Sequence, residues 1–205
     1  MKIELNSVAK GRRDSALPPT TLNYESGSVT LATAETEQRP TVLGLIASGR
    51  MRPDAGAVLI DGRADAADLR SRVALVDAPI VSDPAADVTV AGVTMEELMF
   101  AGLPGTPRDA RRTLEQLGLL DSARTVMSDL APAERIRLLT ELAILREGVE
   151  GIVLVAPDRH GGHPREWWGT AENLAARGFA VLVIAGAASA DAIASHLHAS
   201  QEVAA

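Results

Sequence analysis

Two continuous apolar runs constrain the fold of this chain more than any other feature of its sequence. The runs occupy residues 151–156 (GIVLVA) and 180–185 (AVLVIA), and a helical pattern at residues 164–177 lies between them. Strands that are apolar on both faces are typical of a parallel sheet covered by helices on both sides. The segment therefore predicts a βαβ unit within a layered α/β domain.

Shorter patterns predict the elements that precede and follow this unit. Strand patterns, the first of them alternating like an edge strand, lie at residues 3–8, 27–33, 57–60 and 73–76. Asp61-Gly62 adds a hairpin signal after the third of these strands. Helical patterns lie at residues 41–48, 94–103, 107–119, 133–146 and 190–201. We expect a single domain over residues 1–205 that contains a small helical subdomain at residues 85–145.

Composition excludes several classes of function. The chain has no cysteine, which rules out disulfides, thiolate nucleophiles and cysteine-based zinc sites. Lys2 and Lys10 are the only lysines, so no lysine in the body of the chain can grip a phosphate or form a Schiff base. A net charge of −7 argues against a nucleic-acid partner. No apolar run approaches the roughly 20 residues that span a bilayer, so we expect a cytoplasmic protein without direct membrane insertion.

The order and spacing of these elements resemble the ATP-binding domain of ABC transporters over residues 2–190. The sharpest similarity is RPDAGAVLIDG at residues 52–62, and weaker similarities are LEQLGLLDSA at residues 114–123 and the helix from Glu134 onward. The resemblance implies a P-loop-NTPase-like mixed sheet, with parallel core strands flanked by helices, and a small helical subdomain. It also implies ATP and Mg²⁺ as cofactors. The implied partner is a membrane permease, another ABC subunit or a second copy of the chain, at the inner face of the membrane.

The phosphate-binding loop of that family has lost its functional residues here. The family places Gly-x-x-Gly-x-Gly-Lys-Ser/Thr-Thr between strand and helix, because bare glycine amides and a lysine wrap the phosphates. The matching positions hold Thr33, Ala34, Glu35, Thr36, Glu37, Gln38, Arg39, Pro40 and Thr41. Arg39 replaces the lysine, and Pro40 replaces the hydroxyl that binds magnesium. Glu35 and Glu37 would repel an anionic ligand, so we expect no cofactor at these positions.

The other functional positions of the family are degraded as well. Asp77 and Ala78 stand where a glutamine is expected, and Val155 and Ala156 stand where the magnesium aspartate and the catalytic glutamate are expected. The signature motif keeps only three family residues, and no histidine stands near Gly186, where the family has its switch histidine. The three retained signature residues are Leu130, Glu134 and Arg137. The sequence therefore predicts a non-catalytic, structural or regulatory pseudo-ATPase with no catalytic residue and no bound metal.

Two alternatives remain open at this point. An ATP-binding subunit could still hold nucleotide through an altered loop, with Arg39 gripping a phosphate instead of pairing with Glu35 or Glu37. More distantly, Asp158, His160 and His163 form the one histidine-rich cluster and could hold the metal of a metal-dependent enzyme.

Two apolar features suggest buried or docking surfaces. The adjacent Trp167 and Trp168 cannot both face a core from a helix that is covered on one side, so we expect one of them at an interface or a sheet edge. Met95, Met99 and Phe100 recur at helical spacing. In the resembled family this helical block receives the coupling helix of the transporter.

Overall fold

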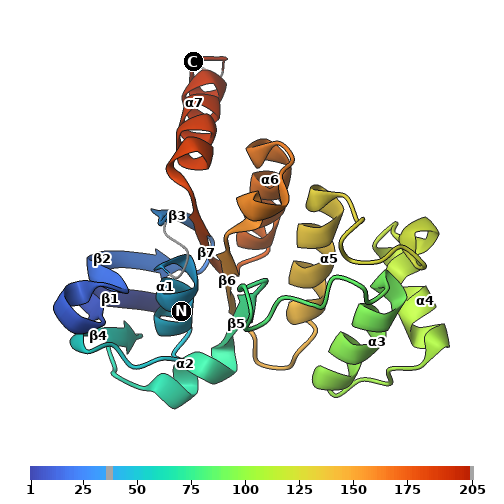
Figure 1. Cartoon of the computed structure of the whole chain (residues 1–205), viewed down its shortest axis with the longest axis horizontal. Helices are drawn as coiled ribbons and strands as arrows, with labels where there is room; N and C mark the ends of the chain where they lie inside the picture. Colours follow the sequence, from blue (N-terminus) through green and yellow to red (C-terminus); the bar gives the residue numbers. More distant parts are fainter. Residues whose placement is uncertain (36–38, 204–205) are drawn as a thin grey trace.

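The strands divide into a parallel and an antiparallel sheet in the computed structural model, which describes residues 1–35 and 39–203 (Figure 1). The antiparallel sheet has the order β2-β1-β4, and the parallel sheet has the order β3-β7-β6-β5. The first sheet contains β1 (Lys2–Lys10), β2 (Leu17–Glu25) and β4 (Ala55–Ile60). The second contains β3 (Val29–Thr33), β5 (Val73–Val76), β6 (Gly151–Val155) and β7 (Ala180–Ala185).

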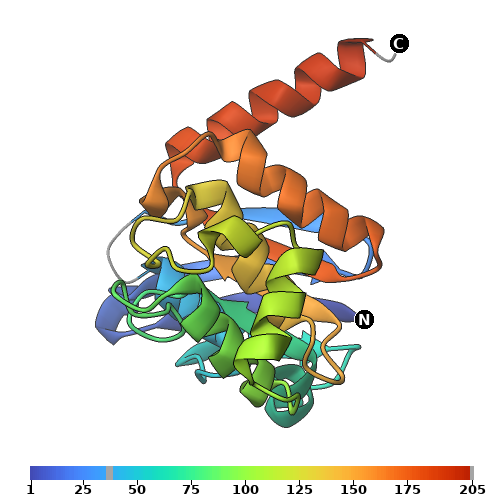
Figure 2. The same cartoon turned by 90° about the vertical axis from the view of Figure 1, so that its right-hand side faces the viewer.

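Helices cover both faces of the parallel sheet and extend beyond it. They are α1 (Arg39–Ala47), α2 (Ala66–Arg72), α3 (Val90–Phe100), α4 (Pro107–Gln116), α5 (Pro132–Ala143), α6 (Pro164–Ala176) and α7 (Ala187–Val203). In Figure 1, α3, α4 and α5 gather on the side of the parallel strands away from the antiparallel sheet. Helix α7 projects from the body of the molecule in both views (Figures 1 and 2).

The two apolar runs are buried on both faces, as their composition predicts. Ile152 and Leu154 of β6 belong to a core shared with α3, α5 and α6. Val153 and Val155, which alternate with them, belong to a second core shared with α1 and the antiparallel sheet. Successive side chains of a strand point to opposite faces, so a strand between two cores is apolar throughout. The layered α/β fold with parallel core strands is confirmed.

Several predicted elements need correction. Strand β1 is the centre of the antiparallel sheet and not an edge strand. The sequence pattern does not predict the edge strand beside it, β2, because Pro18 and Pro19 are unfavourable in the interior of a sheet. Prolines are tolerated on an edge strand. Asp61-Gly62 forms the predicted tight turn, around which Ile60 and Arg63 exchange backbone hydrogen bonds, but the chain then enters α2, a helix that the sequence pattern misses.

The prediction that only one of the two tryptophans can face a core is wrong, because both belong to the same core. Trp167 and Trp168 are 1% and 5% exposed. Helix α6 packs against α5 on one side and against β7 and β3 on the other, so two neighbouring positions can both be buried. The indole N–H of Trp168 donates to Glu172 Oε1 at 2.9 Å, which satisfies its polar atom.

The helices of the described chain include none that is long and apolar enough to cross a membrane.

Candidate functional site

A hollow of about 510 Å³ lies where the parallel strands end. Its walls come from the segments that directly follow β3, β5, β6 and β7 and from the first turn of α1. The carboxyl ends of parallel strands meet at one edge of a sheet, and this edge is where open α/β folds bind ligands. This hollow is therefore the candidate functional site. The residues that line it are Ala34, Glu35, Pro40, Thr41, Pro79, Ala156, Asp158, Arg159 and Gly186.

Two carboxylates of the hollow bind the beginning of α7. The backbone N–H of Ala187 donates to Glu35 Oε1 at 2.7 Å, and the N–H of Gly186 donates to Asp158 Oδ2 at 2.8 Å. The hydroxyl of Ser189 also donates to Asp158 Oδ2, at 3.2 Å. The first N–H groups of a helix lack partners within the helix and carry partial positive charge. Carboxylates from two separate loops thus occupy donors that could otherwise face an anionic ligand.

Gly186 makes this arrangement possible because it has no side chain. A Cβ at this position would lie 3.0 Å from Asp158 Oδ2 and 3.6 Å from Glu35 Oε1. The sequence resemblance described above would place a switch histidine near this position. A side chain here would crowd the carboxylate of Asp158, which would have to shift slightly.

The residues that the sequence resemblance aligns with a phosphate loop are divided between two hollows. Pro40 and Thr41 line the hollow at the strand ends, whereas Thr33 and Arg39 line a neighbouring one of about 450 Å³ together with Leu43. Pro40 lies in the first turn of α1, where it removes one of the N–H groups that a phosphate would accept from. Two further loop positions, Thr36 and Gln38, lie outside the described residues.

Arg39 does not pair with Glu35, one of the two carboxylates predicted as its partners. Its Nε is buried without a hydrogen-bond partner, and no ion pair joins it to Glu35 in the part of the chain that the structure describes. The carboxylate of Glu35 is instead bound by the N–H of Ala187. Glu37, the other predicted partner of Arg39, lies outside the described residues.

A second feature of the site is a charged cluster around the buried Asp77, directly after β5. Asp77 is fully buried, and Nη2 of Arg135 lies 2.9 Å from its Oδ1. Nη2 of Arg159 lies 3.0 Å from the same oxygen, and Nε2 of His160 donates to Oδ2 at 2.7 Å. Arg159 also donates to the backbone carbonyls of Asp77 and Val155. We call Asp77, Arg135, Arg159 and His160 the Asp77 cluster.

The Asp77 cluster keeps its carboxylate ionised and joins separate elements. Burial by itself would raise the pKa of Asp77. The hydrogen bonds from His160 and Arg135 and the charges of Arg159 and Arg135 outweigh burial and hold that pKa below its usual value of 3.8. Arg135 lies in α5, and Arg159 and His160 follow β6, so the cluster ties the helical segment to the end of the parallel sheet.

The three side chains proposed as metal ligands do not converge. Asp158 binds the start of α7, His160 binds Asp77, and Nδ1 of His163 accepts from the N–H of Arg165 as the N-cap of α6. Within residues 1–35 and 39–203, no group of three or more acidic or histidine side chains is arranged to hold a metal ion. Each of the three residues has its own separate partner, so the geometry gives no support to a metal-dependent enzyme centred on them.

Arg135 is the functional residue that sequence reasoning missed. It is 5% exposed, and the apolar Leu138, Leu139 and Leu142 follow it at helical spacing on α5. A basic residue on the apolar face of an amphipathic helix requires a buried counter-charge, and this requirement was a readable signal. What the sequence could not provide was the partner, because Asp77 lies 58 positions away.

The fold and the position of the hollow define a P-loop-NTPase-like α/β domain, and comparisons with known proteins agree at the level of the fold. No protein-family profile and no curated protein matches the chain. Among solved structures, a nucleotide-free ATP-binding cassette from an ABC transporter aligns with a TM-score of 0.66 at 17% identity, over 91% of this chain and 82% of the other. The chain therefore has the fold of an ABC transporter ATP-binding domain.

Two further solved structures give the same result. MJ1267, an ATP-binding cassette of an ABC transporter, aligns with a TM-score of 0.64 at 17% identity, over 90% of this chain and 81% of the other. The cbiO1 protein from Clostridium perfringens, part of the ABC transporter complex cbiONQ, aligns with a TM-score of 0.61 at 16% identity, over 90% and 77%. The resemblance that the sequence suggests is confirmed for the fold.

The described residues of the hollow are a poor match to a magnesium triphosphate. Glu35 and Asp158 bring negative charge to the place where phosphates would lie, and Pro40 brings neither an N–H nor a hydroxyl. Strand β6 ends at Val155, and the next carboxylate, Asp158, is bound to Gly186 and Ser189. The positive charge of Arg159 is directed to Asp77. Like charges a few ångströms apart repel by about 4 kcal/mol at an effective dielectric constant near 20.

Proposed function

We propose that this chain is a non-catalytic subunit with the fold of an ABC-type ATPase, and that its role is structural or regulatory. The observation that carries the proposal is that Glu35 and Asp158 line the hollow and bind the start of α7. Hydrolysis of ATP requires metal ions to neutralise developing charge and a base or orienting group for the attacking water. Val155 and Ala156 occupy the positions from which the fold would provide these groups.

We further propose a membrane permease or another ABC subunit as the partner. The cbiO1 structure belongs to a protein that works within a transporter complex, and the shared fold supports a similar setting for this chain. Residues 85–145 would then act as a subdomain that meets the partner. Met99 and Phe100 at the end of α3 are 59% and 69% exposed, which supports an apolar contact surface there. In that setting the chain would lie at the cytoplasmic face of the membrane.

A measurement of thermal unfolding and turnover tests the non-catalytic role. We expect the unfolding temperature of the purified chain to be unchanged by about 5 mM Mg-ATP, because a ligand stabilises a fold only if it binds the folded state. We also expect no release of phosphate above the blank. A clear thermal shift accompanied by turnover that Arg39→Ala abolishes would overturn the proposal.

A second candidate function is nucleotide binding without hydrolysis. It is favoured by one observation, the buried Nε of Arg39, which has no hydrogen-bond partner. Buried polar atoms without partners are uncommon, and an arginine that is short of partners suits an anion. A thermal shift with Mg-ATP that is lost in Arg39→Ala, without turnover, would favour this candidate over the first.

A further inference from the structure

A groove of about 450 Å³ lies between β2 and β3, which are edge strands of the two sheets. The two strands contact each other near their connecting turn, where the hydroxyl of Thr30 donates to the carbonyl of Asn23 at 3.0 Å. Farther from the turn, β2 and the end of β3 form opposite walls of the groove. Leu17, Ala32 and Leu43, all buried, give it an apolar floor. The groove can therefore hold an extended, partly apolar ligand.

The free edge of β3 opens to this groove. The carbonyl of Ser28 accepts from β7 at 3.1 Å, and the N–H of Ala34 donates to β7 at 2.9 Å. Alternate residues of a strand bond to the same neighbour, so Leu31 and Thr33 direct their backbone groups away from β7. No other segment that the structure describes forms a backbone hydrogen bond with these two residues. An edge of this kind is a template for another extended chain.

Arg39 brings a positive charge to the same groove. Its Nε is buried without a hydrogen-bond partner, and its guanidinium forms no ion pair with any residue that the structure describes. Arg39 lines this groove and does not line the hollow at the strand ends, so its charge serves the groove. Glu35 also lines the groove, but its carboxylate is bound by the N–H of Ala187 at 2.7 Å. Arginine is well suited to bind a carboxylate, because its planar fork of N–H groups matches the two oxygens.

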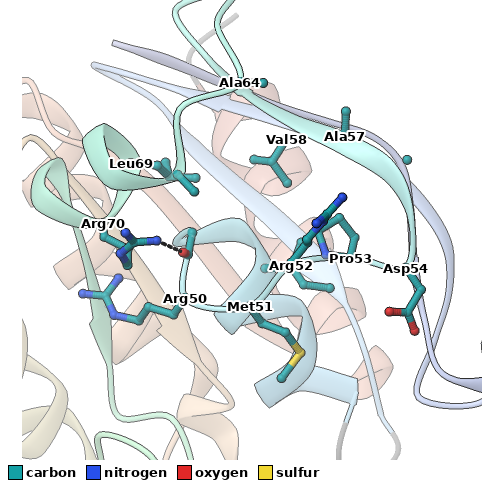
Figure 3. A pocket seen from close by; sticks show the side chains of 14 residues that line it. Arg50, Met51, Arg52, Pro53, Asp54, Ala57, Val58, Ala64, Leu69 and Arg70 are labelled. Atoms are coloured by element: carbon teal, nitrogen blue, oxygen red, sulfur yellow. Dashed lines mark hydrogen bonds between the residues drawn. The ribbon is translucent and has the colours of Figure 1, made fainter.

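The arginines around a pocket of about 560 Å³ at the opposite end of α1 are placed differently (Figure 3). Nη1 of Arg50 donates to two backbone carbonyls at 3.0 Å, and Nη1 of Arg70 donates to the carbonyl of Gly49 at 3.0 Å. Arg52 lies on the other side of the loop after α1 from these two arginines (Figure 3). Arg50 and Arg70 thus hold backbone segments together, whereas Arg39 is open to a ligand.

We propose that an extended peptide segment of a partner protein binds in this groove as an additional strand on β3, with an acidic side chain paired to Arg39. Strand addition draws its affinity from main-chain hydrogen bonds and its specificity from alternate side chains. The side chains that point to the floor meet Ala32 and Leu43, which favours apolar or β-branched residues at alternate positions. Because β2 stands opposite β3, the groove admits a single extended segment and not the sheet edge of a second copy. This binding is independent of the proposed non-catalytic role.

A phage-displayed library of random octapeptides tests the proposal without a known partner. The unmodified chain selects from the library, and the enriched peptides are synthesised with both ends blocked, so that any carboxylate belongs to a side chain. We expect these peptides to carry Asp or Glu, with apolar or β-branched residues at alternate positions. We expect dissociation constants of about 100 μM or lower by calorimetric titration.

Matched variants locate the charge contact. We expect Arg39→Gln, with its fold confirmed by circular dichroism, to bind the selected peptides at least about tenfold more weakly, because a charge-assisted hydrogen bond is lost. Arg111→Gln, which changes an exposed arginine on α4, is the control and should bind like the unmodified chain. Replacing the acidic residue of the peptide by its amide should weaken binding to the unmodified chain by a similar factor.

N-methylated peptides test the strand geometry. Alternate N–H groups of an extended chain point to opposite sides, so only one alternating set can donate to β3. We expect methylation of that set to weaken binding at least about tenfold and methylation of the other set to weaken it less than about twofold. Amide hydrogen exchange at Thr33 should also slow when the peptide binds, while exchange at Ala32, which faces β7, should not change.

Four results would overturn the proposal. One is a selection that yields no peptide with a dissociation constant below about 1 mM. Another is equal affinity of the selected peptides for Arg39→Gln and Arg111→Gln. The third is an equal loss of affinity from both methylated sets. The fourth is displacement of the bound peptide by about 5 mM Mg-ATP, because it would assign Arg39 to a nucleotide.

Discussion

At the scale of single residues, Asp77 shows how charge is balanced in the interior of this chain. Its carboxylate is fully buried and faces Arg135, Arg159 and His160. A buried charge is tolerated only when partners replace its lost hydration, and here the partners come from two other segments of the chain. Asp77, at the position where the sequence resemblance would place a glutamine, is thus the centre of an ion-pair cluster.

Replacing this one carboxylate tests the structural role of the Asp77 cluster. We expect Asp77→Asn to lower the free energy of unfolding by about 3–5 kcal/mol, because Arg135 would remain buried beside a neutral amide. Urea unfolding followed by circular dichroism measures the change. Asp83→Asn is the matched control, because Oδ2 of Asp83 lies 3.6 Å from Nη2 of Arg159 and the side chain of Asp83 is 32% exposed. We expect this variant to lower the free energy of unfolding by less than about 1 kcal/mol. Equal costs for the two variants would contradict this account.

At the scale of elements, the start of α7 is held by two loops that follow other strands. Glu35 follows β3, and Asp158 lies in the turn after β6. Together they accept from the N–H groups of Ala187 and Gly186. These bonds hold the first residues of α7, Ile193 packs into the core beside α6, and the end of the helix projects from the body (Figure 2).

Removing Asp158 should loosen that attachment. We expect Asp158→Ala to lower the free energy of unfolding by about 1 kcal/mol, as the loss of a helix-capping carboxylate does. Amide hydrogen exchange should also become faster at Gly186 than in the unmodified chain. Asp87→Ala, an exposed aspartate outside the site, serves as the control and should change neither quantity. Unchanged exchange at Gly186 in Asp158→Ala would show that the contact does not hold the helix.

At the scale of the whole molecule, the layered fold follows from burial patterns that the sequence shows. The runs at β6 and β7 predict a covered parallel sheet because Ile152 and Val153 each need an apolar neighbour on their own face. Strand β2 could not be predicted in the same way. Its prolines oppose the local pattern, and its place is fixed by pairing with β1 across the sheet.

The candidate site could be predicted only in part. The sequence identified the loop and strand ends that surround the hollow, because their place in the chain follows from the order of elements. It did not predict the partners of Asp158 and His160, since these contacts join residues 28 and 83 positions apart. Contacts of this kind depend on the packed fold and leave no local pattern in the chain.

The central claim is that the hollow at the strand ends is lined by the carboxylates of Glu35 and Asp158 and does not hold a triphosphate. Equilibrium dialysis with labelled ATP and Mg²⁺ tests it most directly. We predict a dissociation constant above about 1 mM for the unmodified chain, and the same result for Arg39→Ala. A dissociation constant of about 10 μM or lower that Arg39→Ala weakens at least tenfold would contradict the claim.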